Sequence, residues 1–305
     1  MSLLSALCVF LFACGGARAD LGYPTRVAAP ANVAVHPRVV IDEAHHNVHT
    51  RAGKYAPFAR LLASDGYDVR SSRAAFTAHS LAGTSVLVIA NARGKPSKAD
   101  PAFTEAECAA VQAWVEAGGA LLLVTDHAPI GNAAKRLADR FGVVMGLGEV
   151  HDSQHAAVGS SDPAQLVFAR RDGLLGAHPI LDGRGPTERI ERVMTFTGQS
   201  LRGPAGSVPL LILSPTAVDL PVEKIEFEPG FFSDTLRTTF GEPVPTTGSQ
   251  ALALTYGRGR VVVTGEAAML TAQILDGERF GMNSPGTDNR QLTLNIVHWL
   301  SGVLP

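Results

Sequence analysis

The sequence predicts an α/β fold, a flavodoxin-like three-layer sandwich with a mostly parallel sheet and a β-rich insert. Short, continuous apolar runs are the first observation behind this prediction, because strands buried on both faces of a parallel sheet are apolar along their length. The second is that segments with helical periodicity separate these runs, as in βαβ units. The third is the stretch from about residue 147 to 249, which has strand-like pieces between Gly- and Pro-rich turns and no strong helical pattern.

Length and composition fit one such domain and argue against two kinds of function. The chain has 305 residues, of which 46 % are hydrophobic and 18 % are charged, so a large core can form and extensive disorder is excluded. The net charge is -2 and no basic run stands out, which argues against binding of nucleic acid. Aromatic residues make up only 6 %, so a carbohydrate cleft built mainly of stacked rings has little material.

The first 19 residues predict export. An apolar stretch from Leu3 to Ala13 precedes small residues and Ala17-Arg18-Ala19, a pattern typical of a signal peptide cut after Ala19. The segment around Cys14 also resembles a lipobox, so a lipid anchor at Cys14 is the alternative. No segment approaches the roughly 20 apolar residues of a transmembrane helix. We therefore expect an exported protein, periplasmic or extracellular, whose mature chain keeps only Cys108 and has no intramolecular disulfide.

The first half of the chain contains alternating strands and helices. Residues 20–37 are Pro- and Ala-rich without periodicity and predict a linker or arm, so a single domain is expected over 38–305. A capping box at Thr104 and Glu107 opens the second of its helices. The apolar runs predict strands at 39–41, 67–69, 85–90, 120–124 and around 143, and helical spacing predicts helices at about 55–62, 104–115 and 132–141.

The second half begins with the insert and ends with a return to the core. Strands are expected in the insert at 165–169, 193–197 and 210–213, as an antiparallel insert or an extension of the sheet. A hairpin turn at Gly257-Arg258-Gly259 then joins strands at 251–256 and 260–264. Asp288 with Gln291 predicts a capped final helix that ends at Gly302.

Polar residues follow three of the predicted core strands. In an open parallel sheet ligands bind beyond the carboxyl ends of the strands, so these residues are expected to face a common cleft. Part of the 147–249 insert is expected to cover this cleft. The three polar segments are 42–49 with sequence DEAHHNVH, Asp126-His127, and Gly265-Glu266.

Carboxylates and imidazoles in such a cleft indicate acid/base chemistry. Glu43 or Glu266 is expected to act as general base, and Asp126 and His127 complete the predicted catalytic set. A single carboxylate at a strand end commonly only caps a neighbouring helix, but three such strand ends together favour a functional site. Either glutamate, held near the other, is expected to have a raised pKa.

The same segments also predict a metal site. The expected ligands of a divalent metal such as zinc are Asp42, His45, His46 and His49. The spacing of His45 and His49 could place both rings on one helical face, but no glutamate follows the first histidine, so the zincin motif is absent. Three later residues could complete such a site, although a solvated loop is the preferred interpretation for them: His151, Asp152 and His155.

The order of these segments resembles a known superfold. The segments IDEAHHN, SVLVIANA, VEAGGALLLVTDHAPIG, YGRGRVVVTGEAAM and LNIVHWL are similar to the class I glutamine amidotransferase-like superfold. They are most similar to its secreted bacterial branch related to trehalose-utilisation-like domains. The resemblance covers about residues 38–146 and 250–302, and it implies a fold more specifically than a function.

The resemblance also implies a pocket whose nucleophile has been replaced. In that superfold a nucleophile occupies a sharp turn after a central strand, and here that turn reads Thr125-Asp126-His127, without cysteine. Cys108 falls in the preceding helix and cannot take its place, so thiol chemistry is not expected. The late strand ends in Gly265-Glu266, where amidotransferases of this class carry a His-Pro-Glu segment.

Two classes of function follow. The first is an exported hydrolase or lyase, metal-assisted if the metal site forms, whose substrate is a small molecule or carbohydrate. Export and the trehalose-utilisation-like resemblance favour a sugar or glycoside. The second is a non-catalytic module that binds a ligand or partner in the same pocket. The density of titratable groups favours the enzyme, because binding pockets are mostly apolar with few polar anchors.

Overall fold

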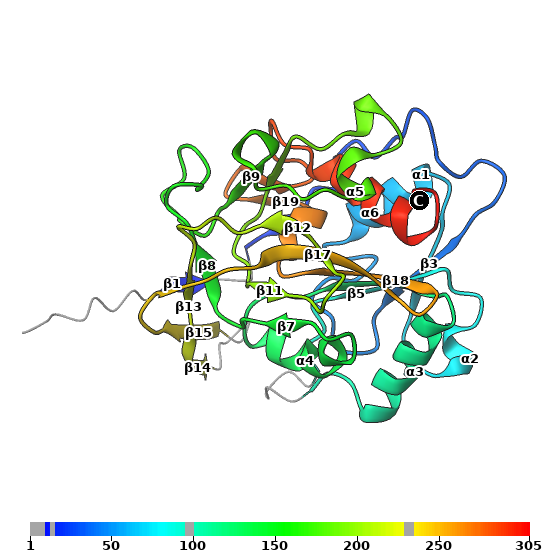
Figure 1. The fold of residues 1–305 in the computed structure, drawn as a ribbon, viewed down its shortest axis with the longest axis horizontal. Coiled ribbons are helices and arrows are strands. Elements are labelled where there is room, and N and C mark those ends of the chain that lie inside the picture. The colour runs from blue at the N-terminus through cyan, green and yellow to red at the C-terminus, as the bar shows by residue number, and fades with distance from the viewer. Residues whose placement is uncertain (1–9, 13–15, 95–100, 229–234) are drawn as a thin grey trace, which may run out of the picture.

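A nine-stranded mixed sheet forms the centre of the molecule (Figure 1). The computed structural model describes residues 10–12, 16–94, 101–228 and 235–305. The strands of the central sheet lie in the order β4-β3-β5-β6-β18-β17-β11-β7, and β12 also pairs with β17. Their bounds are β3 Arg38–Asp42, β4 Asp68–Ser72, β5 Val86–Ala90, β6 Ala120–Val124, β7 Val144–Met145, β11 Leu201–Arg202, β12 Val208–Ile212, β17 Ser249–Tyr256 and β18 Gly259–Thr264.

The strands from β4 to β18 form a parallel half. β3 pairs with β4 and β5, β5 pairs with β6, and β6 pairs with β18. β5 and β6 are buried along their whole length, as their continuous apolar runs predict. The carboxyl ends of β3, β5, β6 and β18 therefore lie side by side at one edge of the sheet.

The other half of the sheet is antiparallel, so the expectation of a mostly parallel sheet is wrong. β17 runs antiparallel to β18 because a tight turn, with Gly257 at φ 56°, can join only antiparallel neighbours. β11 and β12 from the 147–249 region add further antiparallel pairs to β17. β7 does not complete a βαβ unit; it pairs antiparallel with β11 at the far edge. The flavodoxin-like three-layer arrangement as a whole stays a prediction.

Two hydrophobic clusters lie on opposite faces of the parallel half. Successive side chains of a strand point to opposite faces, and accordingly Val39 and Ile41 belong to one cluster while Val40 belongs to the other. The first cluster contains buried residues of α1 and α6, and the second contains those of α3 and α4. The helices are α1 Ala56–Ser64, α2 Ala78–Leu81, α3 Glu105–Glu116, α4 Ile130–Arg140, α5 Pro179–Asp182 and α6 Asn289–Leu300.

One of the two predicted capping boxes forms. Thr104 accepts a hydrogen bond from the Glu107 amide, and the Glu107 side chain accepts one from the Thr104 amide, as predicted for α3. The predicted box at α6 is wrong, because the Asp288 side chain makes no cap hydrogen bond to that helix. Asp288 Oδ2 instead accepts hydrogen bonds from the amides of Glu191 and Arg192, and so ties the start of α6 to the strand β10.

Small sheets and short helices lie in the described part of residues 147–249. β13 lies between β8 and β16, β9 pairs with β10, and β14 pairs with β15, which also pairs with β1. The bounds are β1 Phe10–Phe12, β8 Glu149–His151, β9 Val167–Ala169, β10 Arg192–Met194, β13 Val218–Leu220, β14 Val222–Glu228, β15 Thr235–Phe240 and β16 Val244–Pro245, with 3-10 helices η1 Arg170–Asp172 and η2 Pro186–Glu188.

A further small sheet follows β18 near the end of the chain. β19 (Ala272–Leu275) pairs with β20 (Glu278–Gly281) and with β2 (Arg18–Ala19). The 3-10 helix η3 (Ala268–Leu270) connects β18 to it. Most of the expected signal peptide (residues 1–19) lies outside the described residues. Cys14, the alternative lipid-anchor position, also lies outside them. Among the helices that the structure describes, none is long and apolar enough to cross a membrane.

Residues 20–37 contain no helix or strand and are attached to the domain at both ends. The Asp20 amide donates to a carbonyl of β19 at 2.8 Å. At the other end the Ala31 amide donates to Asp65 Oδ1 at 2.8 Å. Asp65 in turn pairs with His298 of α6 at 2.6 Å, with both side chains fully buried. The arm is thus joined to α1 and to the last helix.

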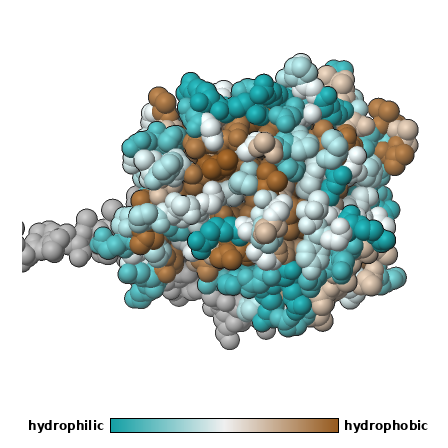
Figure 2. Space-filling model, in the orientation of Figure 1, coloured by the Kyte–Doolittle hydropathy of each residue, from teal (hydrophilic) through white to brown (hydrophobic). Residues whose placement is uncertain are grey.

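Surface hydropathy follows this arrangement on the face shown in Figure 2. Hydrophilic residues lie along its upper and lower margins, and hydrophobic ones lie mainly in the middle, where Figure 1 shows β12 and β17. The lower margin is where α3 and α4 present their outer faces.

Candidate functional site

Four adjacent strands of the sheet end in a polar residue. Asp42 ends β3, Asn91 follows β5, Asp126 follows β6 after one residue, and Glu266 follows β18 after one residue. The order β3-β5-β6-β18 therefore brings four polar side chains to one edge, although 224 positions separate Asp42 from Glu266 in the printed numbering. The sequence predicts three of these side chains as site residues and misses Asn91.

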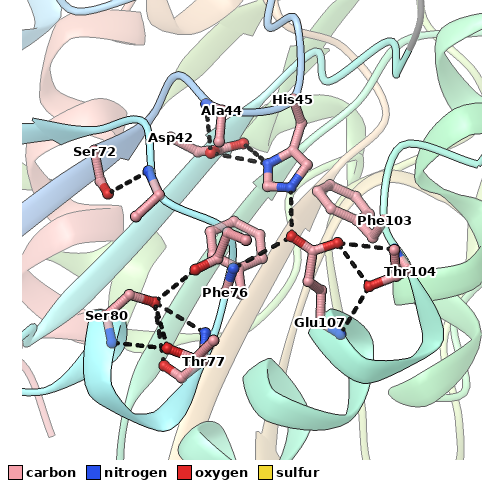
Figure 3. A network of polar contacts seen from close by, with 12 residues as sticks. Asp42, Ala44, His45, Ser72, Phe76, Thr77, Ser80, Phe103, Thr104 and Glu107 are labelled. Carbon is pink, nitrogen blue, oxygen red and sulfur yellow. Dashed lines mark hydrogen bonds and ion pairs between the residues drawn. The ribbon is translucent and has the colours of Figure 1, made fainter.

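Asp42, the first of these four residues, belongs to a buried network around His45 (Figure 3). His45 Nδ1 lies 2.9 Å from Asp42 Oδ2, and His45 Nε2 lies 2.9 Å from Glu107 Oε1. The rings of Phe76 and Phe103 pack beside the imidazole with centroids 4.7 Å away in both cases. Both ring nitrogens are therefore occupied by carboxylates of this chain.

The electrostatics of this network indicate an ion pair. Burial lowers the pKa of His45, but the hydrogen bonds and charges of Asp42 and Glu107 outweigh burial, so the pKa is raised. Burial alone would raise the pKa of Glu107, but hydrogen bonds from Thr104 and His45 bring it down to about 2. A protonated His45 between two carboxylates holds the loop after β3 against the start of α3.

The predicted metal ligands do not converge. His46 is exposed, at φ 53°, and His49 is buried away from the Asp42 network, stacked on Tyr55 with ring centroids 5.0 Å apart. Within the described ranges, no group of three or more His, Cys, Asp or Glu side chains is placed to hold a metal ion. The structure thus gives Asp42 and His45 a structural role, and the metal stays a prediction.

Asp126 and Glu266 do come together. Burial raises the pKa of Glu266 well above its ordinary value, and the nearby charge of Asp126 raises it further. Burial also raises the pKa of Asp126, against the lowering effects of the His127 charge and of a hydrogen bond from Asn91. Glu266 is 1 % exposed and accepts hydrogen bonds from the amides of Ala268 and Met269. Two carboxyls that favour their protonated forms therefore share one buried region.

Three residues around this pair were not predicted as site residues or were given another role. The Tyr55 ring is fully buried, and the charges of Glu266 and Asp126 add to the effect of burial in raising the pKa of its hydroxyl. Burial lowers the pKa of His49 to about 3, so this imidazole is neutral. Asn91, at φ 49°, donates from Nδ2 to Asp126 Oδ2 at 2.9 Å. The helical spacing of Tyr55 with Leu62 had indicated only core packing.

Several buried polar atoms of this region have no hydrogen-bond partner among the described residues. Such atoms are costly in a folded protein unless a ligand or water satisfies them. Both donors and acceptors are among them, which suits a polar molecule bound at the site. The unpartnered atoms are His49 Nδ1, the Tyr55 hydroxyl, Asn91 Oδ1, Asp126 Oδ1 and Gln250 Nε2.

His127 belongs to a neighbouring group. Its Nε2 lies 3.7 Å from Glu149 Oε2, and its Nδ1 lies 2.8 Å from its neighbour's carbonyl oxygen. Glu149 is buried and pairs with His151 Nε2 through its other oxygen at 2.7 Å. Since β8 carries both Glu149 and His151, the 147–249 region does supply polar residues beside the predicted catalytic histidine.

Glu43 has its own partners, and its side chain is only 9 % exposed. Its Oε1 accepts a hydrogen bond from the Arg51 amide at 3.0 Å, and its Oε2 lies 3.4 Å from Nε of the exposed Arg73. None of its contacts among the described residues involves Glu266 or Asp126. Between the two glutamates that the sequence predicts as general base, the contacts favour Glu266.

Lys54 lines a surface cavity, and its charge acts on one member of the carboxyl pair. A cavity of about 490 Å³ lies beside it, lined by Arg18–Gly22 and Ala52–Lys54. The charge of Lys54 lowers the pKa values of both His49 and Asp126, although in each case burial has the larger effect. A lysine without a motif around it gave no signal in the sequence.

The loop after β10 packs against the carboxyl pair. Gln199 Nε2 donates to the Asp126 carbonyl oxygen at 2.6 Å, and the Gln199 amide donates to the Gly265 carbonyl oxygen. Thr197 has φ 95°, a strained value for a β-branched residue, and a Cβ at Gly198 would lie 2.9 Å from the Glu266 Cβ. Close packing of this loop thus fixes Asp126 and Glu266 relative to each other.

No family model matches the chain, and no curated protein matches it. Among solved structures, the chain is similar to one described as "mmIFT52 N-terminal domain", with 14 % identity, a TM-score of 0.60, and coverage of 87 % of this chain and 97 % of that one. It is also similar to a putative ThuA-like protein from Bacteroides uniformis ATCC 8492, with 14 % identity, a TM-score of 0.44, and coverage of 92 % and 95 %. A putative ThuA-like protein from Parabacteroides merdae ATCC 43184 gives 11 % identity, a TM-score of 0.46, and coverage of 88 % and 90 %.

The first of these similarities shows a shared fold and nothing about activity, because its identity is only 14 %. The TM-scores of the two ThuA-like structures, 0.44 and 0.46, are too low to support an argument. The expected relationship to the amidotransferase-like superfold therefore stays a prediction at the level of its branch and its function.

Proposed function

We propose that the protein is an exported hydrolase or lyase in which Asp126 and Glu266 form the acid/base pair. The observation that carries this proposal is that both carboxyls lie in one buried region and both have raised pKa values. Pairs of titratable groups with perturbed pKa values are typical of acid/base sites. The substrate class is a small polar molecule, with sugars and glycosides first in order.

The surroundings of the two carboxyls indicate which one is the general acid and which one is the general base. Glu266 has its pKa raised well above the ordinary range and suits the acid, which holds a proton for the leaving group. Asp126 receives the Asn91 hydrogen bond and the favourable charge of Lys54, which both stabilise its ionised form, so it suits the base. In hydrolysis Asp126 accepts a proton from water while Glu266 donates one to the departing oxygen.

The alternative is a non-catalytic binding module on the same fold. One observation favours it: Glu266 is 1 % exposed, and neither of the two cavities described, of about 490 and 390 Å³, is lined by Glu266 or Asp126. A buried carboxyl pair of that kind could form hydrogen bonds to a bound polar ligand without reacting. The density of unpartnered polar atoms around the pair is compatible with both classes.

The discriminating experiment is a hydrolase screen with matched variants. The full chain would be assayed on 4-nitrophenyl glycosides and esters, with and without EDTA, beside Asp126→Asn and Glu266→Gln. Loss of either carboxyl is expected to lower kcat about 10²- to 10⁴-fold, the usual contribution of a general acid or base. Asp276→Asn is the control, because Asp276 is exposed and its φ of 51° is one that asparagine tolerates.

The outcomes separate the two classes and test the metal. Undiminished turnover in both variants contradicts the proposed acid/base pair, and absence of turnover on every substrate favours the binding module. Inactivation by EDTA that zinc reverses would support the predicted divalent metal at Asp42, His45, His46 or His49. Activity that EDTA leaves unchanged removes the metal from the proposal.

A further inference from the structure

Lys54 lies in the wall of the surface cavity, and its charge acts on Asp126 of the buried carboxyl pair. It belongs to the wall of the cavity of about 490 Å³, and it precedes Tyr55, whose fully buried ring lies in the field of Asp126 and Glu266. Its charge reaches His49 and Asp126. A ligand at this wall therefore meets a cation whose charge also acts on the buried pair.

The ammonium group of Lys54 is left without a fixed partner. Among the residues that the structure describes, no hydrogen bond or ion pair of the Lys54 side chain is found, and the side chain is only half-buried. By contrast, Lys135 on α4 pairs with Asp139 at 2.8 Å. The structure therefore leaves the Lys54 ammonium group at the cavity wall available to a ligand.

The other charges of the cavity restrict the kind of anion. Asp20 lies in the same wall, but its oxygens accept hydrogen bonds from the Gly22 amide and from Asn283 Nδ2. The negative groups of Asp20 and Asp126 oppose a dianion, and a phosphate is usually held by several N–H donors. Arg18, Lys54 and Asp20 together give the wall one net positive charge, which matches one negative charge, so a carboxylate fits better than a phosphate.

We propose that Lys54 selects substrates that carry a carboxylate, such as a sugar acid, and that the cavity between Arg18–Gly22 and Ala52–Lys54 receives this group. The inference rests on the proposed function, because it assigns the reacting part of the substrate to Asp126 and Glu266. Cleavage after Ala19 would remove Arg18 and Ala19 from the wall but would leave Lys54 in place. The selectivity therefore belongs to the domain.

The test compares two sugars that differ at a single carbon. D-glucuronate carries a carboxylate where D-glucose carries a hydroxymethyl group, and binding of each to the full chain is measured by calorimetry at low and high salt. Wild-type protein is expected to bind glucuronate about 10-fold more tightly than glucose, as one charge-assisted hydrogen bond allows. High salt should reduce this preference, because the lysine is at the surface.

The variants identify the source of the preference. Lys54→Met should bring the ratio of the two affinities close to one, Lys54→Arg should keep it, and the control Lys135→Met should leave it unchanged. Equal binding of both sugars by wild type, no binding of glucuronate, or a preference that survives Lys54→Met would each overturn the inference. Unfolding midpoints of the variants, compared with wild type, show that each binds as a folded protein.

This design separates the inference from the proposed function. If glucuronate is preferred through Lys54 but no 4-nitrophenyl glucuronide, glucoside or ester is hydrolysed, the recognition role stands and the acid/base role fails. If 4-nitrophenyl glucoside is hydrolysed as fast as the glucuronide at equal concentrations, the acid/base role stands and the selectivity fails.

Discussion

Asn91 Nδ2 lies 2.9 Å from Asp126 Oδ2, and this hydrogen bond joins the residues that follow two neighbouring strands, β5 and β6. The second carboxyl oxygen, Oδ1 of Asp126, is buried and has no partner among the described residues. The amide thus favours the ionised form of Asp126 on one side and leaves the other side open to a substrate or water. No other side chain of the described region donates a hydrogen bond to this carboxylate.

Replacing Asn91 with alanine tests this relationship. Loss of the hydrogen bond should raise the pKa of Asp126 further, so the acid limb of the pH profile of kcat/KM should move upward by about one unit. The free energy of unfolding should fall by about 1–2 kcal/mol, since a buried hydrogen bond to a charged group is lost and alanine is strained at the φ of 49°. The measurements are pH–rate profiles and urea unfolding, with exposed Asn132→Ala as control. An unchanged profile would contradict the proposed role of Asp126 as base.

Glu266→Gln should separate activity from stability. The folded-state pKa of Glu266 is raised, so the stability that its protonated form contributes is present below the unfolded value of about 4.3 and is lost as pH rises through the folded pKa. Glutamine does not titrate. Wild type should therefore lose stability relative to Glu266→Gln as pH rises above about 4.3, while kcat of the variant stays about 10²- to 10⁴-fold lower. Parallel pH dependence of unfolding in the two proteins would show that Glu266 is not strongly perturbed.

The His45–Glu107 pair should contribute to stability in a limited pH window. The pKa of His45 is raised, so its contribution is present below about 6.5 and is lost as pH rises through the folded pKa. The pKa of Glu107 is lowered to about 2, so its contribution is present above about 4.3 and is lost as pH falls through about 2. The pair therefore stabilises the folded protein most between about pH 4.3 and pH 6.5.

His45→Asn checks this window. The variant leaves the buried Asp42 without its cation and should be destabilised by about 3 kcal/mol at pH 6, with a smaller difference at pH 9. Urea unfolding at the two pH values measures it, and exposed His79→Asn is the matched control. If EDTA changes the unfolding midpoint of wild type but not of His45→Asn, the residue binds metal and the structural role is wrong.

Cys108 should be dispensable for turnover. It is fully buried in α3, and burial raises the pKa of its thiol to about 11, so the thiolate that reacts is scarce at neutral pH. Cys108→Ala should keep activity within a few-fold and lower the free energy of unfolding by roughly 1 kcal/mol. Complete loss of activity in the folded variant would restore a thiol mechanism.

Local patterns predicted the parallel core well because they depend on neighbours in the sequence. The apolar run 120–124 is β6 with the same bounds, and the capping box at Thr104 opens α3. Strand direction was predicted less well, because the paired residues of β7 and β11 lie 56 and 58 positions apart and no local signal reports such a partner. The Asp288 cap failed for the same reason, since its carboxylate bonds to amides about 97 residues away.

In the candidate site, too, the residues at strand ends could be predicted, and the contacts between distant residues could not. The polar strand ends at Asp126 and Glu266 could be found, because parallel strands place their carboxyl ends together. The partner of His45 could not be predicted, because Glu107 lies 62 residues away and was assigned only to a helix cap. Lys54 and Tyr55 likewise carry no motif, and their importance comes from burial and charge that only the fold creates.

The pairing of β6 with β18 has a consequence for how the chain is made. β18 ends about 140 residues after β6. One edge of the apolar strand β6 therefore has no strand to pair with while the ribosome adds the intervening residues. At about 5 to 20 residues per second the wait is roughly 7 to 28 s. During that interval β6 presents unpaired amides and carbonyls to other chains, a known route to aggregation. The nascent protein should therefore depend on chaperone binding until residue 264 has been synthesised.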